Sequence, residues 1–269
     1  MFKSVKYVLD ENLNNLYRIY SIAKYELLSD MRESNLGLFW NFAHPLIQIV
    51  TYWFVFGLVF NRKDVDGIPF IQWVLGGMVI WFFINPCITK GCNAIYTKRN
   101  VVTKMKFPVS ILPATVVLQE LFNHLCILII VVLFMMVQGR MPSIYWLELL
   151  YYMPCAFIFA TSLSMLTSVL NMLARDVRKM ILACMRMLLY LTPILWPIDR
   201  LKDYKLITFI VKVNPIYYIV CGYRDAFFYH RGLWPYHKQM LAFWVITLVI
   251  FVIGSCMMFK FKRKIIDLI

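Results

Sequence analysis

The chain lacks the sequence motifs that indicate a nucleotide site, a metal site or a framework of structural disulfides. It has no Gly-x-x-x-x-Gly-Lys-Ser/Thr phosphate loop, and its ten glycines are scattered. Its seven cysteines form no Cys-x-x-Cys pair, and its four histidines show no metal-ligand spacing. We therefore predict no ATP site, no metal site, no disulfide framework and no catalytic residue in this chain.

Acidic residues are also scarce, with 14 Asp and Glu against 28 Lys and Arg. A membrane-embedded glycosyl- or phosphotransferase would need several carboxylates at one membrane face, and no such cluster is present. Asp199 and Asp203 are four residues apart, but Arg200, Lys202 and Lys205 surround them. We interpret these two aspartates as part of a solvated loop, and we expect no nucleic-acid partner.

Apolar residues, by contrast, make up 61% of the 269 residues. A bilayer span needs about 20 of them to cross about 30 Å of hydrocarbon. The apolar runs predict an all-α integral membrane protein with one domain over residues 1–269. The six predicted spans are 34–61 (apolar centre 45–60), 67–89, 111–137, 149–174, 187–198 and 239–259. The fifth run is short, and Arg186 is expected to reach the surface at its end.

Basic residues in the connections predict the orientation. With a cytoplasmic N-terminus, the inner segments carry 18 Lys and Arg and the outer segments carry 10. The prediction is a multi-pass membrane protein with both termini in the cytoplasm.

Two segments outside the spans have their own patterns. Residues 1–33 predict an amphipathic helix, with Leu13, Leu16, Tyr17 and Tyr20 on its apolar face. We expect it to lie in the membrane interface; a soluble helix packed on a partner is the alternative. Residues 199–238 form the outer loop, in which Asn214 and Pro215 predict a helix start. The predicted helix ends at Gly232 and carries an apolar stripe of Ile216, Val220, Tyr223 and Phe227. That helix would be re-entrant or interfacial, either lining a pathway or covering the bundle.

Glu120 and His124 share one helix face in the third span, where they either pair structurally or serve a transport path. Aromatic residues make up 17% of the chain, many of them near span ends. Each can be an interfacial anchor, and together they also suit a path for sugars.

Several segments resemble a known family. They are Ser34-x-Leu-Gly-x-x-Trp40-x-x-x-x-Pro45, Lys104-Met-Lys-Phe-Pro108, Arg175-Asp176, Thr192-Pro-Ile-Leu-Trp-Pro197 and Asn214-Pro215 with Tyr223-Arg224. In this order they resemble the type-2 ABC exporter permeases that move lipid-linked polysaccharides. Residues 45–53, 67–70 and 81–85 are most similar to permeases of wall teichoic acid exporters, and O-antigen or capsule exporters are the alternative. A type-2 ABC drug exporter and a non-catalytic scaffold also remain open.

The resemblance implies a homodimer that binds two copies of a cytoplasmic ATPase subunit, which would hold the ATP and Mg. It also implies a location in the bacterial cytoplasmic membrane, contact with membrane lipids and a substrate linked to undecaprenyl pyrophosphate. It further implies a short coupling helix in the loop of residues 95–106. The implied ATPase-coupling residues are Lys98, Arg99, Lys104, Arg175, Asp176 and Arg178. Arg18, Lys24 and Arg32 are the candidate contacts for the lipid pyrophosphate. The candidate substrate path comprises Trp40, Trp53, Trp81, Tyr190, Trp196, Tyr217, Tyr218 and Tyr223.

Overall fold

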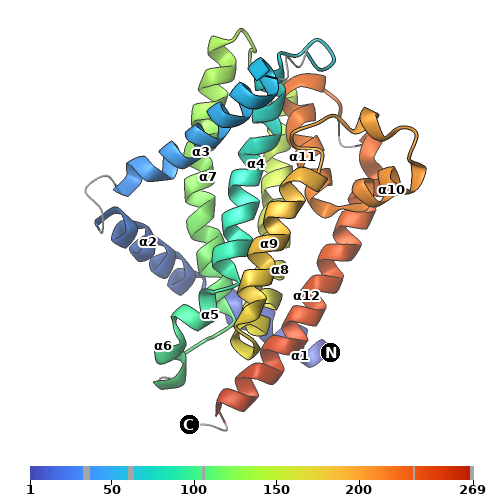
Figure 1. The fold of residues 1–269 in the computed structure, drawn as a ribbon. Coiled ribbons are helices and arrows are strands. Elements are labelled where there is room, and N and C mark those ends of the chain that lie inside the picture. The colour runs from blue at the N-terminus through green and yellow to red at the C-terminus, as the bar shows by residue number, and fades with distance from the viewer. Residues whose placement is uncertain (33–36, 60–63, 105–106, 233, 267–269) are drawn as a thin grey trace.

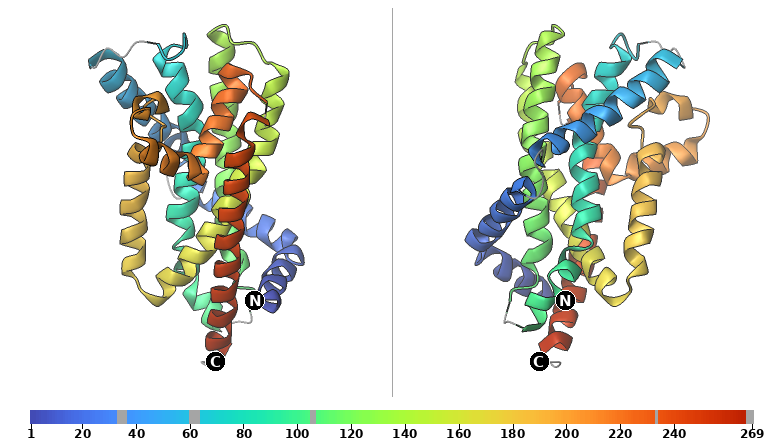
Figure 2. Two further views of the ribbon diagram at one scale, coloured as in Figure 1. Left: turned by 90° about the vertical axis from the view of Figure 1, so that its right-hand side faces the viewer. Right: turned by 60° about the vertical axis from the view of Figure 1, so that its left-hand side comes forward.

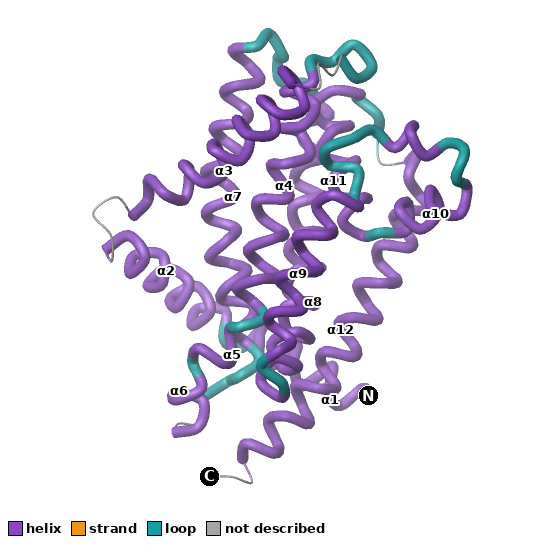
Figure 3. Tube along the Cα trace, in the orientation of Figure 1, coloured by secondary structure: helices purple, strands orange, loops and turns teal. Residues whose placement is uncertain are grey.

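The computed structural model describes residues 1–32, 37–59, 64–104, 107–232 and 234–266, and these form a helical bundle (Figure 1). Figure 3 shows helix along nearly all of the described chain and strand in none of it. The N-terminus and the described residues nearest the C-terminus lie at one end of the bundle, hereafter the terminal end, and the other end is the far end (Figures 1 and 2). The helices, with short 3-10 or π helices labelled η, are α1 (Phe2–Leu13), α2 (Leu16–Arg32), α3 (Gly37–Tyr52), η1 (Trp53–Val59), α4 (Phe70–Gly91), α5 (Ala94–Thr97), α6 (Arg99–Lys104), α7 (Ile111–Val137), η2 (Ile144–Glu148), α8 (Leu149–Leu173), α9 (Asp176–Leu191), η3 (Ile198–Leu201), α10 (Lys205–Val213), α11 (Pro215–Arg224), η4 (Asp225–Tyr229), η5 (Trp234–Tyr236) and α12 (His237–Ile266).

Four helices are long and apolar enough to cross a bilayer, which makes the chain a multi-pass membrane protein. They are Phe70–Gly91, Ile111–Val137, Ile144–Leu173 and His237–Lys262, and they correspond to the second, third, fourth and sixth predicted spans. A bent pair, Lys205–Val213 with Pro215–Tyr229, could count as a fifth. The predicted total of six is therefore not confirmed. The first predicted span, 34–61, contains the shorter apolar helix Ala43–Val59. Residues 34–36 and 60–61 of the predicted span lie outside the described part of the chain.

The fifth predicted span differs most from the prediction. The apolar run 187–198 was expected to be helical, but α9 occupies Asp176–Leu191 instead. Pro193 and Pro197 explain the difference, because proline cannot donate a backbone hydrogen bond and disfavours helix in the residue before it. Arg186 consequently lies within α9, on an exposed face, and not at the end of a span. Figure 2 shows α9 at the edge of the bundle in both views.

The centre of the bundle is α4, which packs against α7, α8 and α11. Most of its residues are buried, and the side chains of Met78, Val79 and Phe83 are 0% exposed. An apolar helix that is buried on all sides is the expected core of a bundle whose outer helices face lipid. Consistent with this, the most apolar stretches of α7 and α12 have a much smaller share of buried residues than that of α4.

The N-terminal region is two helices, not the single helix that the pattern predicted, because the chain bends at Asn14 and Asn15 between α1 and α2. In α2, Ile19 and Ala23 are buried, and Ile19 packs against the start of α7. The predicted apolar face, by contrast, is exposed, with Tyr17 at 84%. That face is free to contact lipid or a partner.

A polar cluster fixes α1 to the rest of the bundle. Glu11 accepts hydrogen bonds from Lys262 Nζ at 2.8 Å and from Ser110 Oγ at 2.6 Å, and Tyr7 joins the same cluster. Burial alone would raise the pKa of Glu11, but the hydrogen bonds from Lys262, Ser110 and Tyr7 outweigh burial and hold the pKa below its ordinary value of 4.5. The cluster therefore joins α1, α7 and α12 at the terminal end.

The predicted helix start in the outer loop is confirmed. Asn214 is the N-cap of α11 and its Oδ1 accepts a hydrogen bond from the backbone N–H of Ile216 at 2.9 Å, with Pro215 at the first helical position. The expected apolar stripe of α11 and η4 is buried: Ile216, Val220, Tyr223 and Phe227 are at most 3% exposed. The helix ends at Tyr229, slightly before the predicted end at Gly232. The 82° bend between α10 and α11 fits a broken span or a re-entrant loop.

Candidate functional site

The segments predicted to couple to an ATPase come together at the terminal end. The guanidinium of Arg99 lies 4.5 Å from the ring centre of Tyr96, and that of Arg175 lies 5.4 Å from the same ring. Arg99 begins α6 and Arg175 precedes α9, so one aromatic ring of α5 joins two loops that are about 80 residues apart in the sequence. Such cation–π contacts contribute about 0.5–1 kcal/mol each at exposed sites.

Further polar contacts hold this surface together. Asn171 Nδ2 donates a hydrogen bond to Asn93 Oδ1 at 3.2 Å, which joins the end of α8 to the start of α5. Lys98 Nζ lies 2.8 Å from Glu26 Oε1, so α2 is joined to the same region. A cavity of about 320 Å³ lies between α5 and the α8–α9 turn.

The remaining predicted coupling residues lie at the same end. Asp176 is the first residue of α9 and pairs with Lys179 at 3.2 Å on an exposed face. Arg178 lines the cavity. The backbone of Lys104 ends α6, but its side chain lies outside the described residues. We call the exposed surface of Lys98, Arg99, Arg175, Asp176 and Arg178 around Tyr96 the coupling surface.

Sequence reasoning missed Tyr96, Asn93 and Asn171 because each acts through a contact with a distant segment. Tyr96 lies within the predicted coupling loop of residues 95–106, so its position was available, but its role as the shared ring was not. Nothing local to Asn171, inside an apolar span, indicates a partner in the loop 78 residues away.

The basic residues predicted to contact the lipid pyrophosphate are all on α2. Arg18, Lys24 and Arg32 are exposed along this helix, which lies beside α7 (Figure 1). Their exposure leaves them accessible to an anionic headgroup, and no contact with a ligand tests that role.

The predicted path aromatics separate into two groups. Trp40, Trp53 and Tyr190 are exposed, and Trp196 is half-buried. Tyr52, next to Trp53, interacts through its hydroxyl with Tyr190, so the C-terminal ends of α3 and α9 meet. The second group is at most 6% exposed and packs inside the bundle; it consists of Trp81, Tyr217, Tyr218 and Tyr223. In this conformation, only the first group can face a path outside the protomer.

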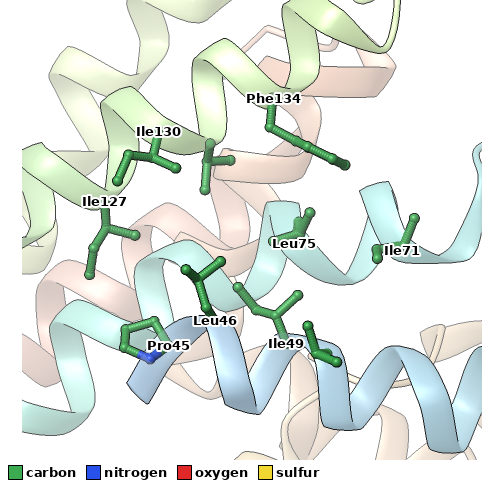
Figure 4. Close-up of a pocket in the computed structure, with 10 residues that line it drawn as sticks. Pro45, Leu46, Ile49, Ile71, Leu75, Ile127, Ile130 and Phe134 are labelled. Carbon is green, nitrogen blue, oxygen red and sulfur yellow. The ribbon is translucent and has the colours of Figure 1, made fainter. Parts of the chain in front are cut away.

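An entirely apolar groove lies beside this region. It has a volume of about 220 Å³ and lies between α3, α4 and α7 (Figure 4). Leu46 and Ile49 of α3 face Leu75 of α4 across it, with Ile127 and Ile130 on α7. No polar group lines the groove among the described residues, so it can accept only hydrocarbon.

Glu120 and His124 do not bond to each other. Glu120 Oε1 pairs with Lys90 Nζ of α4 at 2.6 Å, and His124 Nε2 shares a hydrogen bond with the Tyr223 hydroxyl at 3.0 Å. Both residues are at most 4% exposed. A structural role is thus accounted for by partners on other helices, which the helix spacing alone did not reveal.

At the far end, two of the resemblance segments interlock. Arg224 Nη1 donates to the carbonyl of Pro193 at 2.6 Å, and Nη2 donates to that of Ile194 at 2.5 Å. The same guanidinium lies 3.5 Å from the ring centre of Trp73. Asn214 Nδ2 donates to Thr192 Oγ1 at 3.1 Å. We call this set of contacts the arginine lock, since Arg224 binds the carbonyls that the prolines after α9 leave without helical partners.

A close approach to α4 makes the arginine lock possible. A Cβ atom on Gly77 would lie 2.7 Å from Arg224 Nη2, and one on Gly76 would lie 2.7 Å from the ring of Phe228. Neither contact is tolerable, so both positions require glycine as the structure stands. The glycine pair lets the guanidinium reach the face of Trp73.

A bundle with at least four membrane-length helices, a basic surface at one end and buried interlocking segments at the other defines a multi-pass helical membrane protein. The chain belongs to the ABC-2 type transporter family, whose model matches residues 17–228. It is 25% identical over 250 residues to the O-antigen export system permease protein RfbA of Myxococcus xanthus. This alignment covers 91% of this chain and 92% of that protein. It is also 24% identical to the protein of the same name from Klebsiella pneumoniae, over 88% of this chain and 89% of that one.

Proposed function

We propose that this chain is the membrane subunit of an ATP-driven exporter that moves a lipid-linked cell-surface polysaccharide across the cytoplasmic membrane. Two copies of the chain would form the pathway, and a separate ATPase subunit would bind each copy at the terminal end. That end would face the cytoplasm, as the distribution of basic residues predicts.

The observation that carries this proposal is the coupling surface. Arg99 and Arg175 come from different loops and stack on one ring of Tyr96. A displacement of this surface by a bound ATPase subunit would therefore move α5, α6 and α9 together. The positive-inside distribution explains why these loops are basic but gives no reason for them to be joined. A chain without a phosphate loop needs an external source of energy, and a joined surface of this kind is suited to receive it.

For the substrate, the relatives favour O-antigen or a similar polysaccharide. The matched relatives are named for O-antigen export, and each match covers about nine tenths of both chains. The narrower prediction of wall teichoic acid, which rested on residues 45–53, 67–70 and 81–85, is not confirmed. We therefore propose export of O-antigen or a similar polysaccharide as the main function, with undecaprenyl pyrophosphate as the lipid carrier.

The route of the substrate follows from exposure. The pyrophosphate would approach Arg18, Lys24 and Arg32 on α2, because Lys and Arg bind anionic oxygens well. The polymer would then pass between α3 and α9 of the two copies, where Trp40, Trp53 and Tyr190 are exposed. Both helices are shorter than the bilayer spans and lie at the edge, a position that a second copy could cover.

The first experiment removes the gene and measures surface polysaccharide and the cytoplasmic pool of lipid-linked polymer. The proposal predicts loss of the first and accumulation of the second. Normal surface polysaccharide, together with ATPase stimulation by hydrophobic compounds, would establish the drug-exporter alternative in its place.

The second experiment tests the coupling surface. Replacing Arg175 and Asp176 together with alanine should leave ATP hydrolysis by the purified complex but stop export. The matched control replaces Arg200 and Asp203, an exposed pair of the same charges near the far end. Normal export by the first double variant would remove these residues from the coupling role.

A further inference from the structure

The cavity of about 320 Å³ beside Tyr96 lies at the depth where two membrane-length helices end. Asn93, in its wall, comes two residues after α4 ends at Gly91. Asn171, also in its wall, comes two residues before α8 ends at Leu173. Because α4 and α8 are long enough to cross a bilayer, their ends mark the boundary between the hydrocarbon and the lipid headgroups. The cavity therefore lies at the depth of lipid phosphate groups.

The lining of this cavity is positively charged. It includes Arg175, Arg178 and Lys179, all exposed, and none of the described residues that line it is acidic. Lys179 pairs with Asp176 at 3.2 Å, which offsets one of the three charges. The side chains of Arg175 and Arg178 form no ion pair and no hydrogen bond within the described ranges of the chain. Their N–H groups are therefore available to an anion, since the contact of Arg175 with the Tyr96 ring is not a hydrogen bond.

Neutral residues complete the walls of the cavity. Asn171 is 2% exposed and donates a hydrogen bond to Asn93, so the wall that α8 and α5 share is held in place. Leu182 lines the cavity on α9, one turn after Arg178, so a basic and an apolar side chain lie on one face of that helix. Since α9 runs from the terminal end toward the far end, Leu182 lies deeper in the membrane than Arg178 (Figure 2). A ligand with an anionic head and a hydrocarbon chain matches the order of these side chains.

A carboxylate of the ATPase subunit is the competing occupant, because Arg175 and Arg178 also belong to the coupling surface. Lys179 and Leu182, however, lie outside that surface and further along α9. A soluble subunit contacts loops beyond the membrane, whereas these two residues line the cavity at the depth of the headgroups. The positive-inside distribution explains basic residues at this end, but it does not require three of them in the wall of one cavity. A lipid headgroup accounts for both the charge and the depth.

From these observations we propose that the cavity binds the phosphate group of an anionic membrane lipid. Basic cavities between membrane helices on the cytoplasmic side are typical sites for anionic headgroups, and the terminal end is the one expected to face the cytoplasm. Arg175 and Arg178 donate to the phosphate oxygens, and Lys179 adds positive charge. Leu182 contacts the hydrocarbon next to the headgroup. A phospholipid and the lipid carrier both supply this chemistry, so the site does not depend on the proposed function.

The test titrates lipids onto the purified full-length permease and measures their binding by native mass spectrometry. Phosphatidylglycerol and undecaprenyl phosphate are compared with zwitterionic phosphatidylcholine, and inorganic phosphate is added as a competitor. At least one anionic lipid should bind more tightly than phosphatidylcholine. Arg178→Gln combined with Lys179→Gln should weaken its affinity by about tenfold or more, because two of the three cations are lost. The matched control, Arg200→Gln with Lys202→Gln, should bind as the unchanged protein does, since neither residue lines the cavity and Lys202, like Lys179, pairs with an aspartate three residues before it.

A second variant separates lost charge from altered folding. Arg178→Lys combined with Lys179→Arg keeps both charges and should retain the affinity for the anionic lipid. Tighter binding of phosphatidylglycerol assigns the site to a phospholipid, and tighter binding of undecaprenyl phosphate assigns it to the carrier. The proposal is overturned if the glutamine variant binds lipid as well as the unchanged protein, if the charge-conserving variant is as weak as the glutamine variant, or if inorganic phosphate displaces the lipid at equal concentration. Lost association with the ATPase at unchanged lipid affinity would also overturn it, by assigning the cavity to the ATPase subunit. The gene deletion tests the proposed function separately, so a protein that exports polysaccharide without this lipid preference refutes the lipid site alone.

Discussion

Replacing Arg224 with leucine should destabilise the permease strongly, because it removes the arginine lock from a buried site. Arg224 is 5% exposed and makes two short bonds, of 2.6 and 2.5 Å, to the carbonyls of Pro193 and Ile194. At the lower end of about 1.5 kcal/mol for each hydrogen bond to a charged group, the loss amounts to about 3 kcal/mol. The contact with Trp73 is left out of this sum, so it is a lower bound.

Thermal unfolding of the detergent-solubilised protein, followed by intrinsic tryptophan fluorescence, measures this loss. With the scaling known for domains of similar size, about 3 kcal/mol corresponds to a fall in Tm on the order of 6–12 °C. The Tm of Arg224→Lys should lie between those of the parent protein and of Arg224→Leu, because an ammonium lacks the planar fork that binds two carbonyls. Arg200→Leu, an exposed arginine in η3, is the matched control and should change Tm little. If Arg224→Leu unfolds at the temperature of the control, the arginine lock does not stabilise the fold.

Gly77→Ala should also lower Tm, because the added Cβ would lie 2.7 Å from Arg224 Nη2. Gly232→Ala is the control and should leave Tm unchanged, because its Cβ meets nothing closer than 4.0 Å. Equal Tm values for the two variants would contradict the close approach of Arg224 to Gly77. Glu11→Gln should lower Tm at neutral pH. Since the pKa of Glu11 is depressed in the folded protein, its stabilisation is present above about pH 4.5 and is lost as the pH falls further, so the Tm difference between variant and parent should shrink there; a constant difference would refute the charged role. Tyr96→Leu should impair export more than it impairs ATP hydrolysis, whereas an equal loss of both would indicate a folding defect.

The spans that could be predicted are those whose signal is local. For α7, the predicted and observed bounds agree, because its 27 residues are mainly apolar, contain no Lys or Arg, and have no proline after Pro113. Asn214 and Pro215 likewise predicted the start of α11, since capping depends on the residue and its next few neighbours. The predicted bounds of α9 were wrong because hydropathy does not register the effect of Pro193, which ends the helix inside the apolar run.

The candidate sites were predictable only in part. The two basic loops lie at one end of the bundle, and their junction at Tyr96 depends on the packing of α5 against α8. The same applies to the path aromatics, because Trp53 and Tyr223 look alike in hydropathy and only packing exposes one and buries the other. Side-chain burial is set by which helices are neighbours, and the periodicity of a single helix does not specify its neighbours.

By itself, the sequence determined that this is a helical membrane protein and that it carries no phosphate-loop motif, since apolar run length and such a motif are properties of contiguous residues. The tertiary structure decided which partners the buried polar groups have. Glu120 pairs with Lys90 rather than with His124, and Arg224 binds carbonyls after α9. In a low-dielectric interior each buried charge must find a partner, and which one it finds depends on how helices distant in the sequence pack together.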